Sequence, residues 1–434
     1  MATVDAGPEE TVELQEFRGR VAGFLESRAR PRRRAEQDDK QEDERKDEQE
    51  DLFDAPATDA SSQRILAETK AYQAALFDAG LAGLTWPKAY GGQELPGPYQ
   101  QAFNEEAAGF DLPVAPLTIG FGMCGPTILA VGTDAQKERY IPPLLRADDI
   151  WCQLFSEPGA GSDVASLQTR AVRDGDEFVV SGQKVWTSGA HYADFGALLA
   201  RTNVDVPKHR GLTMLIVDMH SAGVTVRPLR QMNGGANFNE VFFDRVRIPV
   251  DNVLGQIDQG WSAAITMLMN ERVAIGAGGN VRRAGGGVKS LIGLARRAGV
   301  ARDPVVRQRL VDLYIRETVQ HYVGLRIQSA VRAGRAPGPE GSIAKLAGAE
   351  LGRRMADVAA GIAGLSTQAW LPADRQAGRW HSMITSAPGG SLAGGTNEVQ
   401  RNIIGERVLG LPREPQVDRD VPFRSLLVGT QSRT

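Results

Sequence analysis

The stretch Trp151–Asp163, WCQLFSEPGAGSD, joins a strand-like run to a glycine-rich turn in a chain of 434 residues. It begins with apolar and β-favouring residues and ends with two glycines and a hydroxyl side chain. Glycines let a backbone lie tightly against a flat or phosphorylated ligand. Taken alone, the stretch is explained equally well as a tight turn capped by an Asp or Ser side chain.

The pattern of the chain changes at this stretch. Before it, apolar residues recur with helical spacing in four segments, 14–25, 65–81, 99–109 and 128–145, with a break at Trp86–Gly92. After it, short runs rich in β-formers alternate with turn residues, which predicts a small antiparallel β domain. Helical spacing returns after Gly255, and a last helix is expected from Asn397 to about Leu409. Long helices of this kind bury their apolar stripes against each other as a bundle.

The order α, β, α predicts a mainly α, α+β fold with three domains. We expect an N-terminal helical domain over 1–148, a central β domain over 149–256 and a C-terminal helical bundle over 257–434. Within the first, the run from Pro31 to Asp51 is almost all charged and has few apolar residues to bury. The region 31–60 is therefore predicted to be a disordered or exposed insertion.

Composition excludes several classes of protein. The formal net charge of −3 gives no overall attraction to nucleic acid or to an anionic membrane surface. Only two cysteines occur, Cys124 and Cys152, so we expect buried thiols rather than a disulfide framework. The chain starts without a signal-peptide pattern and has no apolar run long enough to cross a bilayer, which predicts a cytoplasmic protein.

Two patterns that could indicate a bound metal or phosphate are incomplete. The glycine-rich tract Gly276–Gly287 is not followed by the Gly-Lys-Ser of a phosphate-binding loop, so small residues at helix crossings explain it better. The five histidines show no metal-ligand spacing, and no metal site is expected.

Three segments together resemble the acyl-CoA dehydrogenase family. WCQLFSEPGAGSD and GQKVWTSGAHYADF, Gly182–Phe195, are similar to its flavin-binding segments, and GGTNEVQRNIIGERVLGLPRE, Gly394–Glu414, is similar to its C-terminal signature. Weaker likeness at 247–255 and 83–92 extends the resemblance over nearly the whole chain. The resemblance implies a helical N-terminal domain, a central β domain and a C-terminal four-helix bundle, in agreement with the order α, β, α.

The resemblance also implies a site for FAD. Phe155 and Ser156 are expected to meet the flavin ring, and Ser162 to lie near the pyrophosphate or the acyl-CoA chain. Trp186 is expected to pack against the isoalloxazine, although an isolated tryptophan at this position would be explained as a core residue. Ser188 is expected to hydrogen-bond near flavin N5, where a hydride arrives. The full set of implied cofactor-binding residues is Phe155, Ser156, Ser162, Trp186, Thr187, Ser188, Arg297, Gln308, Thr396 and Glu398.

The reaction that the resemblance implies is α,β-desaturation of an acyl-CoA thioester, which requires a carboxylate to remove the α-proton. Many members carry this base immediately before the Gly-Thr of the C-terminal signature, where this chain has Gly394. Other members carry a Glu-Arg pair on the first long C-terminal helix, and here Glu271 and Arg272 match it. Glu271 is therefore the expected base. The alternative is that Glu271 is a helix-surface glutamate paired with a neighbouring cation, without a catalytic role. The implied substrate-binding residues are Ser162, Arg272 and Gly395.

Departures from the family pattern leave other functions open. An Arg-x-x-Phe-Gly element appears only as Arg297–Ala301 without its aromatic ring, and a Gln-x-x-Gly-Gly-x-Gly element has become 361–367 with a single matching glycine. These elements contact FAD between subunits in the family.

The leading hypothesis is an FAD-dependent acyl-CoA dehydrogenase of fatty acid or lipid metabolism that passes electrons to an electron-transfer flavoprotein. We expect a homodimer or homotetramer, with no nucleic-acid or membrane partner. The alternatives are a non-catalytic or half-catalytic subunit of a hetero-oligomer, and a flavin monooxygenase or oxidase on the same fold.

Overall fold

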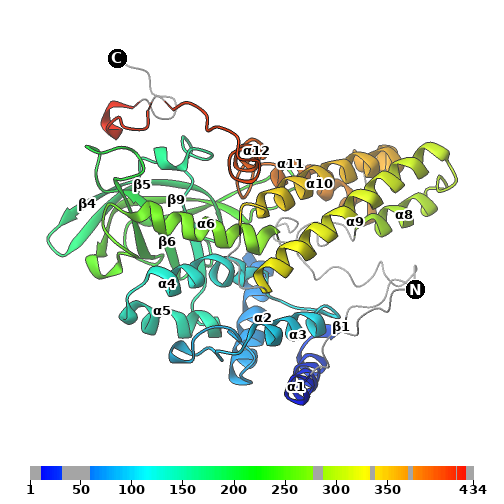
Figure 1. The fold of residues 1–434 in the computed structure, drawn as a ribbon, viewed down its shortest axis with the longest axis horizontal. Coiled ribbons are helices and arrows are strands. Elements are labelled where there is room, and N and C mark those ends of the chain that lie inside the picture. Colours follow the sequence, from blue (N-terminus) through cyan, green and yellow to red (C-terminus); the bar gives the residue numbers. More distant parts are fainter. Residues whose placement is uncertain are drawn as a thin grey trace. The chain divides into compact units, whose positions relative to one another are not determined.

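The computed structural model describes residues 11–31, 59–276, 287–332, 338–369, 375–416 and 418–426 (Figure 1). The described parts of 1–49, 60–116 and 134–149 form one compact unit, and those of 50–59, 117–133 and 150–434 form a second. The charged region predicted as an insertion lies almost wholly outside the described residues. Because the second unit holds both the strands and the bundle, the predicted domain limits stay predictions.

The first unit is helical. Its helices are α1 (Val12–Arg28), α2 (Asp59–Asp78), α3 (Gly97–Ala107) and α5 (Asp134–Arg146), and a short pairing joins β1 (Arg30–Pro31) to β2 (Phe110–Asp111). Thr11 starts α1 as its N-cap, because its hydroxyl accepts the N–H of Leu14 at 3.4 Å. The helical spacing of α1 buries its apolar stripe in one core with α2 and α3, and the buried members are Phe17, Val21, Leu25, Tyr72, Leu76, Leu81, Ala82, Leu84 and Ala102.

One predicted helix is in fact two. The segment 128–145 was expected to be continuous, but the structure has α4 (Gly125–Val131) and then α5. Gly132 is extended, with ψ of 155°, and its N–H closes α4 on the Ile128 carbonyl at 2.8 Å. The Gly-Thr-Asp sequence at 132–134 supplies a helix stop followed by helix-starting residues, which apolar spacing alone does not register.

The second unit contains a seven-stranded sheet. Its strands are β3 (Trp151–Leu154), β4 (Arg170–Asp174), β5 (Glu177–Ser188), β6 (Phe195–Arg201), β7 (Leu212–Asp218), β8 (Val224–Leu229) and β9 (Phe238–Pro249). The order is β3-β6-β4-β5-β9-β8, with β7 also paired to β6. Neighbours are antiparallel except that β3 runs parallel to β6 and β4 meets β6 in parallel at Arg170 and Arg201. The sheet is thus mixed rather than purely antiparallel.

The helices of the second unit form a bundle beside the strands (Figure 1). They are α6 (Gly260–Gly276), α8 (Gly287–Arg297), α9 (Pro304–Arg332), α10 (Gly341–Ala363), α11 (Arg375–Gly390) and α12 (Asn397–Ile403). α10 packs on α6, α8, α9, α11 and α12, and α6 also packs on β7. The helix expected to end near Leu409 is α12 followed by a π-helical turn, Ile404–Val408. The predicted α, β, α order is confirmed.

Candidate functional site

The structure brings the first two motifs together at the ends of β3 and β5. The Val185 N–H donates to the Ser156 carbonyl at 2.9 Å, and the Lys184 ammonium donates to the Phe155 carbonyl at 2.9 Å. Phe155 is buried and Ser156 is half-buried. The backbone that follows β3 is therefore fixed beside the end of β5, directly before Trp186.

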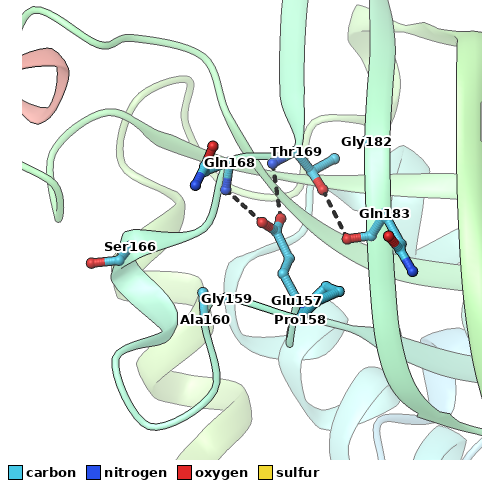
Figure 2. A pocket seen from close by; sticks show the side chains of 9 residues that line it. All are labelled: Glu157, Pro158, Gly159, Ala160, Ser166, Gln168, Thr169, Gly182 and Gln183. Carbon is cyan, nitrogen blue, oxygen red and sulfur yellow. Dashed lines mark hydrogen bonds between the residues drawn. The ribbon is translucent and has the colours of Figure 1, made fainter. Parts of the chain in front are cut away.

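A buried ion pair, Glu157 with Lys184, holds this junction. The Lys184 ammonium lies 2.8 Å from the Glu157 carboxylate, which also accepts the N–H groups of Gln168 at 2.6 Å and Thr169 at 2.8 Å (Figure 2). Burial acts to raise the pKa of Glu157, but the Lys184 charge and these hydrogen bonds outweigh it and lower the pKa. Burial lowers the pKa of Lys184, and Glu157 opposes that change. One carboxylate thus ties the turn after β3 to β5 and to the residues before β4.

The turn itself borders a small pocket. Figure 2 shows the pocket around the Glu157 carboxylate, and its volume is about 250 Å³. Ser162 and its neighbours Gly161 and Asp163 are exposed beyond this turn, so Ser162 is accessible to a ligand. The residues that line the pocket are Glu157, Pro158, Gly159, Ala160, Ser166, Gln168, Thr169, Gly182 and Gln183.

Trp186 interrupts the regular pairing of β5 with β9. The register shifts between Lys184 and Thr187, and Trp186 has a φ of 61°, a left-handed conformation that is unfavourable for a bulky side chain. Its indole is 60% exposed and meets Phe238 edge-on at 6.1 Å. A large aromatic ring held in strained backbone and turned to the outside fits a platform for a flat ligand better than it fits a core residue.

The residues after Trp186 differ in what they can offer a ligand. Thr187 is buried, its carbonyl accepts from the Asn239 side chain at 3.0 Å, and its hydroxyl has no hydrogen-bond partner among the described residues. A buried hydroxyl without a partner costs free energy unless a ligand satisfies it. Ser188 is half-buried at the end of β5. Together with Trp186, these groups fit the ring of a flavin.

Glu271 lies on α6 and is buried, with a relative exposure of 9%. The side-chain nitrogen of Gln153, on β3, is 3.5 Å from one of its carboxylate oxygens. This contact joins the helix of the expected base to the strand that leads into the first motif. The side chain of Arg272, expected beside the substrate, lies outside the described residues.

The Gly394–Gly395 turn has the conformation that glycine favours. The φ angles are 64° and 84°, and a Cβ on Gly395 would lie 2.8 Å from the Gln400 side-chain nitrogen. Gln400 donates to the Gly394 carbonyl at 2.8 Å, and Lys345 on α10 donates to the Gly395 carbonyl at 2.6 Å. Hydrogen bonds to the carbonyl groups of Gly394 and Gly395 therefore hold this turn, where the resemblance places the base of other family members.

Lys345 donates to this turn and is also affected by the charge of Glu271. Burial lowers the pKa of Lys345, while the charges of Glu398 and Glu271 act to raise it. α10 carries Lys345 and packs on both α6 and α12. α10 thus carries an ammonium that donates to the Gly395 carbonyl and on which the charge of Glu271 acts.

Four other expected cofactor contacts lie elsewhere. Thr396 is the N-cap of α12, where its hydroxyl accepts the N–H of Val399 at 3.3 Å, and Glu398 is exposed and pairs with Arg401 at 3.2 Å. Arg297 ends α8 and Gln308 lies near the start of α9, both exposed. In Figure 1, α8 lies at the end of the bundle remote from the strands.

Other expectations from composition can be compared with the described residues. Cys124 and Cys152 are free and buried, as predicted. Across the ranges that the structure describes, no three His, Cys, Asp or Glu side chains are grouped to hold a metal ion. Within the same ranges, no helix has the length and apolar character needed to cross a membrane.

The sequence motifs included Glu157 and Lys184 but gave them no role, and Lys345 was missed. Lys184 lies an even number of residues after the inward positions Phe178 and Val180 of β5, four beyond Val180, and is buried like them. A lysine on the buried face of a strand requires a carboxylate partner, so strand alternation was the available signal. Nothing local distinguishes Lys345, whose partner is 50 residues away.

Comparisons with known proteins cover most of the chain. Sequence profiles of the acyl-CoA dehydrogenase N-terminal, middle and C-terminal domains match residues 11–148, 152–246 and 258–409. The chain is 38% identical to acyl-CoA dehydrogenase IpdE1 of Mycobacterium tuberculosis over 353 residues, 80% of this chain and 89% of that protein.

Two solved structures are also similar. The structure of the Tcur3481-Tcur3483 steroid ACAD has a TM-score of 0.73 at 30% identity, covering 94% of this chain and 99% of that one. The ChsE4-ChsE5 complex from Mycobacterium tuberculosis has a TM-score of 0.69 at 30% identity, covering 95% and 100%. With three matching domain profiles, a relative at this identity and a site that fits a flavin, the chain belongs to the acyl-CoA dehydrogenase family of flavin-dependent oxidoreductases.

Proposed function

We propose that this chain is an FAD-dependent dehydrogenase that introduces an α,β double bond into an acyl-CoA thioester. FAD, when bound, supplies a hydride acceptor at flavin N5. Glu271 removes the α-proton, while the β-hydrogen leaves the substrate with its electron pair. The observation that carries the proposal is the burial of Glu271 on α6 and its contact with Gln153 of β3, because a buried carboxylate beside the strand that leads into the first motif is placed to act as a base.

The chain's own residues divide the work between orientation and proton transfer. Trp186 offers a flat apolar surface, and the Ser188 hydroxyl lies at the end of the same strand. Gln153 orients the Glu271 carboxylate from the strand side. Burial keeps bulk water from Glu271, and a positioned carboxylate then acts as a general base.

For the substrate we propose a lipid-derived acyl group on CoA, with a steroid-derived acyl group as the first choice. The support is the steroid ACAD among the similar structures, together with the match to IpdE1. As electron acceptor we propose an electron-transfer flavoprotein.

The test is anaerobic bleaching of the purified protein. We expect a yellow preparation with bound FAD, whose absorbance is bleached by at least one member of a panel of straight-chain, branched and steroid-derived acyl-CoA thioesters. Addition of an electron-transfer flavoprotein should then restore the absorbance. A flavin-containing protein that no thioester bleaches, but that consumes oxygen with another donor, would instead support a monooxygenase or oxidase.

A second candidate function is a half-catalytic subunit of a hetero-oligomer. It is favoured by Gly394 and by the altered 361–367 element, and two similar structures contain two differently named chains. A chain that is colourless when purified alone and gains FAD only with a second chain would support this candidate over a homodimer or homotetramer.

Trp186→Gly should separate FAD binding from stability. Glycine adopts a φ of 61° without strain, so the apoprotein should be as stable as wild type or up to about 1 kcal/mol more stable. Loss of the indole should raise the FAD dissociation constant about tenfold. Flavin fluorescence titration and thermal unfolding of the apoprotein measure the two effects. Unchanged FAD affinity would contradict the assignment of Trp186 to the flavin site.

A further inference from the structure

The last described segment, Asp418–Leu426, returns to the loop between β6 and β7, residues 202–211. Backbone contacts hold the tail beside this loop. Three of them join tail and loop: Pro422 with Pro207, the Phe423 N–H with the Val206 carbonyl at 2.9 Å, and the Arg424 N–H with the Val204 carbonyl at 3.0 Å.

Arg201, at the end of β6, contacts the tail, the loop and the segment that follows the turn 159–163. Its guanidinium donates to the Lys208 carbonyl at 2.6 Å and to the Ala165 carbonyl at 2.5 Å, and its Cζ is 3.8 Å from the centre of the Phe423 ring. Burial lowers the pKa of Arg201 to about 10, which leaves it charged at neutral pH. A desolvated cation against an aromatic face is strongly held, so Phe423 anchors the tail to Arg201.

Lys208 forms ion pairs with both the tail and the turn 159–163. Its ammonium lies 2.9 Å from the Asp163 carboxylate and 2.7 Å from the Asp418 carboxylate. Burial acts to lower the pKa of Lys208, but the hydrogen bonds to Asp418 and Asp163 outweigh it and raise the pKa. The same Asp163 oxygen accepts the Ser166 hydroxyl at 2.5 Å. Asp163 follows Ser162 directly, so any displacement of Lys208 acts on the turn that faces the ligand.

We propose that Lys208 is a positioning residue of the cofactor site, and that the C-terminal segment Asp418–Leu426 holds Lys208 where it neutralises and orients Asp163. The proposal rests on the proposed function and on the expectation from the family resemblance that Ser162, in the turn 159–163, lies near the pyrophosphate of FAD. An unneutralised Asp163 would repel those phosphates, and an unfixed one would let Ser162 move. The tail therefore sets the affinity of the turn for FAD without touching FAD itself.

The test compares FAD dissociation constants of full-length variants by flavin fluorescence. Lys208→Met should raise the constant about tenfold, and Lys208→Arg should restore most of the affinity. The tail variant Asp418→Ala/Phe423→Ala should also raise it, by about five- to tenfold. An increase in the dissociation constant distinguishes the positioning role from a simple charge effect, because removal of the negative charge of Asp418 would by itself tighten the binding of an anion.

A triple variant, which combines Lys208→Met with the two tail substitutions, tests whether the tail acts through Lys208 or independently of it. In the triple variant the tail substitutions should add less than twofold to the effect of Lys208→Met, since the tail acts through Lys208. Arg424→Ala is the matched control, because this side chain lies on the same tail and forms an exposed pair with Asp205, and the substitution should change the constant less than twofold.

Three results would overturn the proposal or its basis. Unchanged or tighter FAD binding by the tail variant, or multiplicative effects in the triple variant, would overturn the positioning role. If Asp418→Ala/Phe423→Ala does not fold, Phe423→Leu alone provides the same comparison. A wild-type chain that binds no FAD would refute the proposed function rather than the role of the tail.

Discussion

Glu271→Gln is expected to reduce the rate of flavin bleaching by acyl-CoA about 10²- to 10⁴-fold, the range that a general base contributes. Glutamine keeps the size of the side chain and can still contact Gln153, but it cannot accept a proton from the α-carbon. FAD content and the dissociation constant of the thioester should remain close to wild type, because the carboxylate acts in the transition state. Anaerobic stopped-flow absorbance measures the bleaching rate.

Glu350→Gln is the matched control for this variant. Glu350 lies on α10, the helix packed against α6, and its side chain is largely exposed and pairs with Arg401 at 3.0 Å. The same chemical change at this position should leave the bleaching rate nearly unchanged. If Glu271→Gln retained full FAD and bleached at a rate within about tenfold of wild type, the base would have to be sought elsewhere.

Lys184→Met is expected to lower the free energy of unfolding by about 3–5 kcal/mol, because it leaves Glu157 buried without its cation. The loss should also release the turn after β3, since Lys184 donates to the Phe155 carbonyl as well. We therefore expect weak FAD binding in whatever folded protein remains. Urea unfolding followed by tryptophan fluorescence measures the stability, and flavin titration measures the binding.

The double variant Lys184→Met/Glu157→Gln should be less destabilised than the sum of the two single variants. Arg247→Met is the control on the same sheet, because Arg247 forms an exposed pair with Glu177 at 2.8 Å, and it should leave stability nearly unchanged. If the losses in free energy of unfolding of the two single variants simply added in the double variant, Lys184 and Glu157 would not be energetically coupled.

The contribution of Glu157 should depend on pH in a defined direction. Its folded pKa is lowered below the ordinary value of 4.5, so its charge stabilises the fold above that value, and the contribution is lost as the pH falls through the folded pKa. The stability difference between wild type and Lys184→Met should therefore narrow below about pH 4.5. A difference that stayed constant into more acidic solution would contradict an ionised Glu157.

Local patterns predicted the elements well. The spacing of Phe17, Val21 and Leu25 indicated a helix that buries one stripe, and this is the stripe that α1 buries. The runs rich in β-formers after Trp151 became strands of the sheet, because β-propensity is carried by the residues of each run themselves. The predicted helix over 128–145 failed at Gly132, where a single backbone conformation overrode a favourable apolar pattern.

The candidate site was predictable where its residues are adjacent in sequence. Phe155 and Ser156 lie together because they follow one strand, and Trp186 with Ser188 because they end another. That the two pairs are neighbours was implied by the family resemblance and is explained by the hydrogen bond from Val185 to Ser156. The helix that Arg297 ends, α8, lies in contrast at the end of the bundle remote from the strands (Figure 1).

The sequence by itself determined that WCQLFSEPGAGSD begins a β domain, that the chain resembles one flavoprotein family, and that Gly394 cannot serve as the base. Only the tertiary structure decided which charged groups are partners. Lys345 meets the Gly395 carbonyl, and Lys208 meets Asp418 across 210 residues of sequence. A buried charge is stabilised by whatever group the folded backbone brings within hydrogen-bonding distance, and that distance is set by the paths of strands and helices rather than by neighbouring residues.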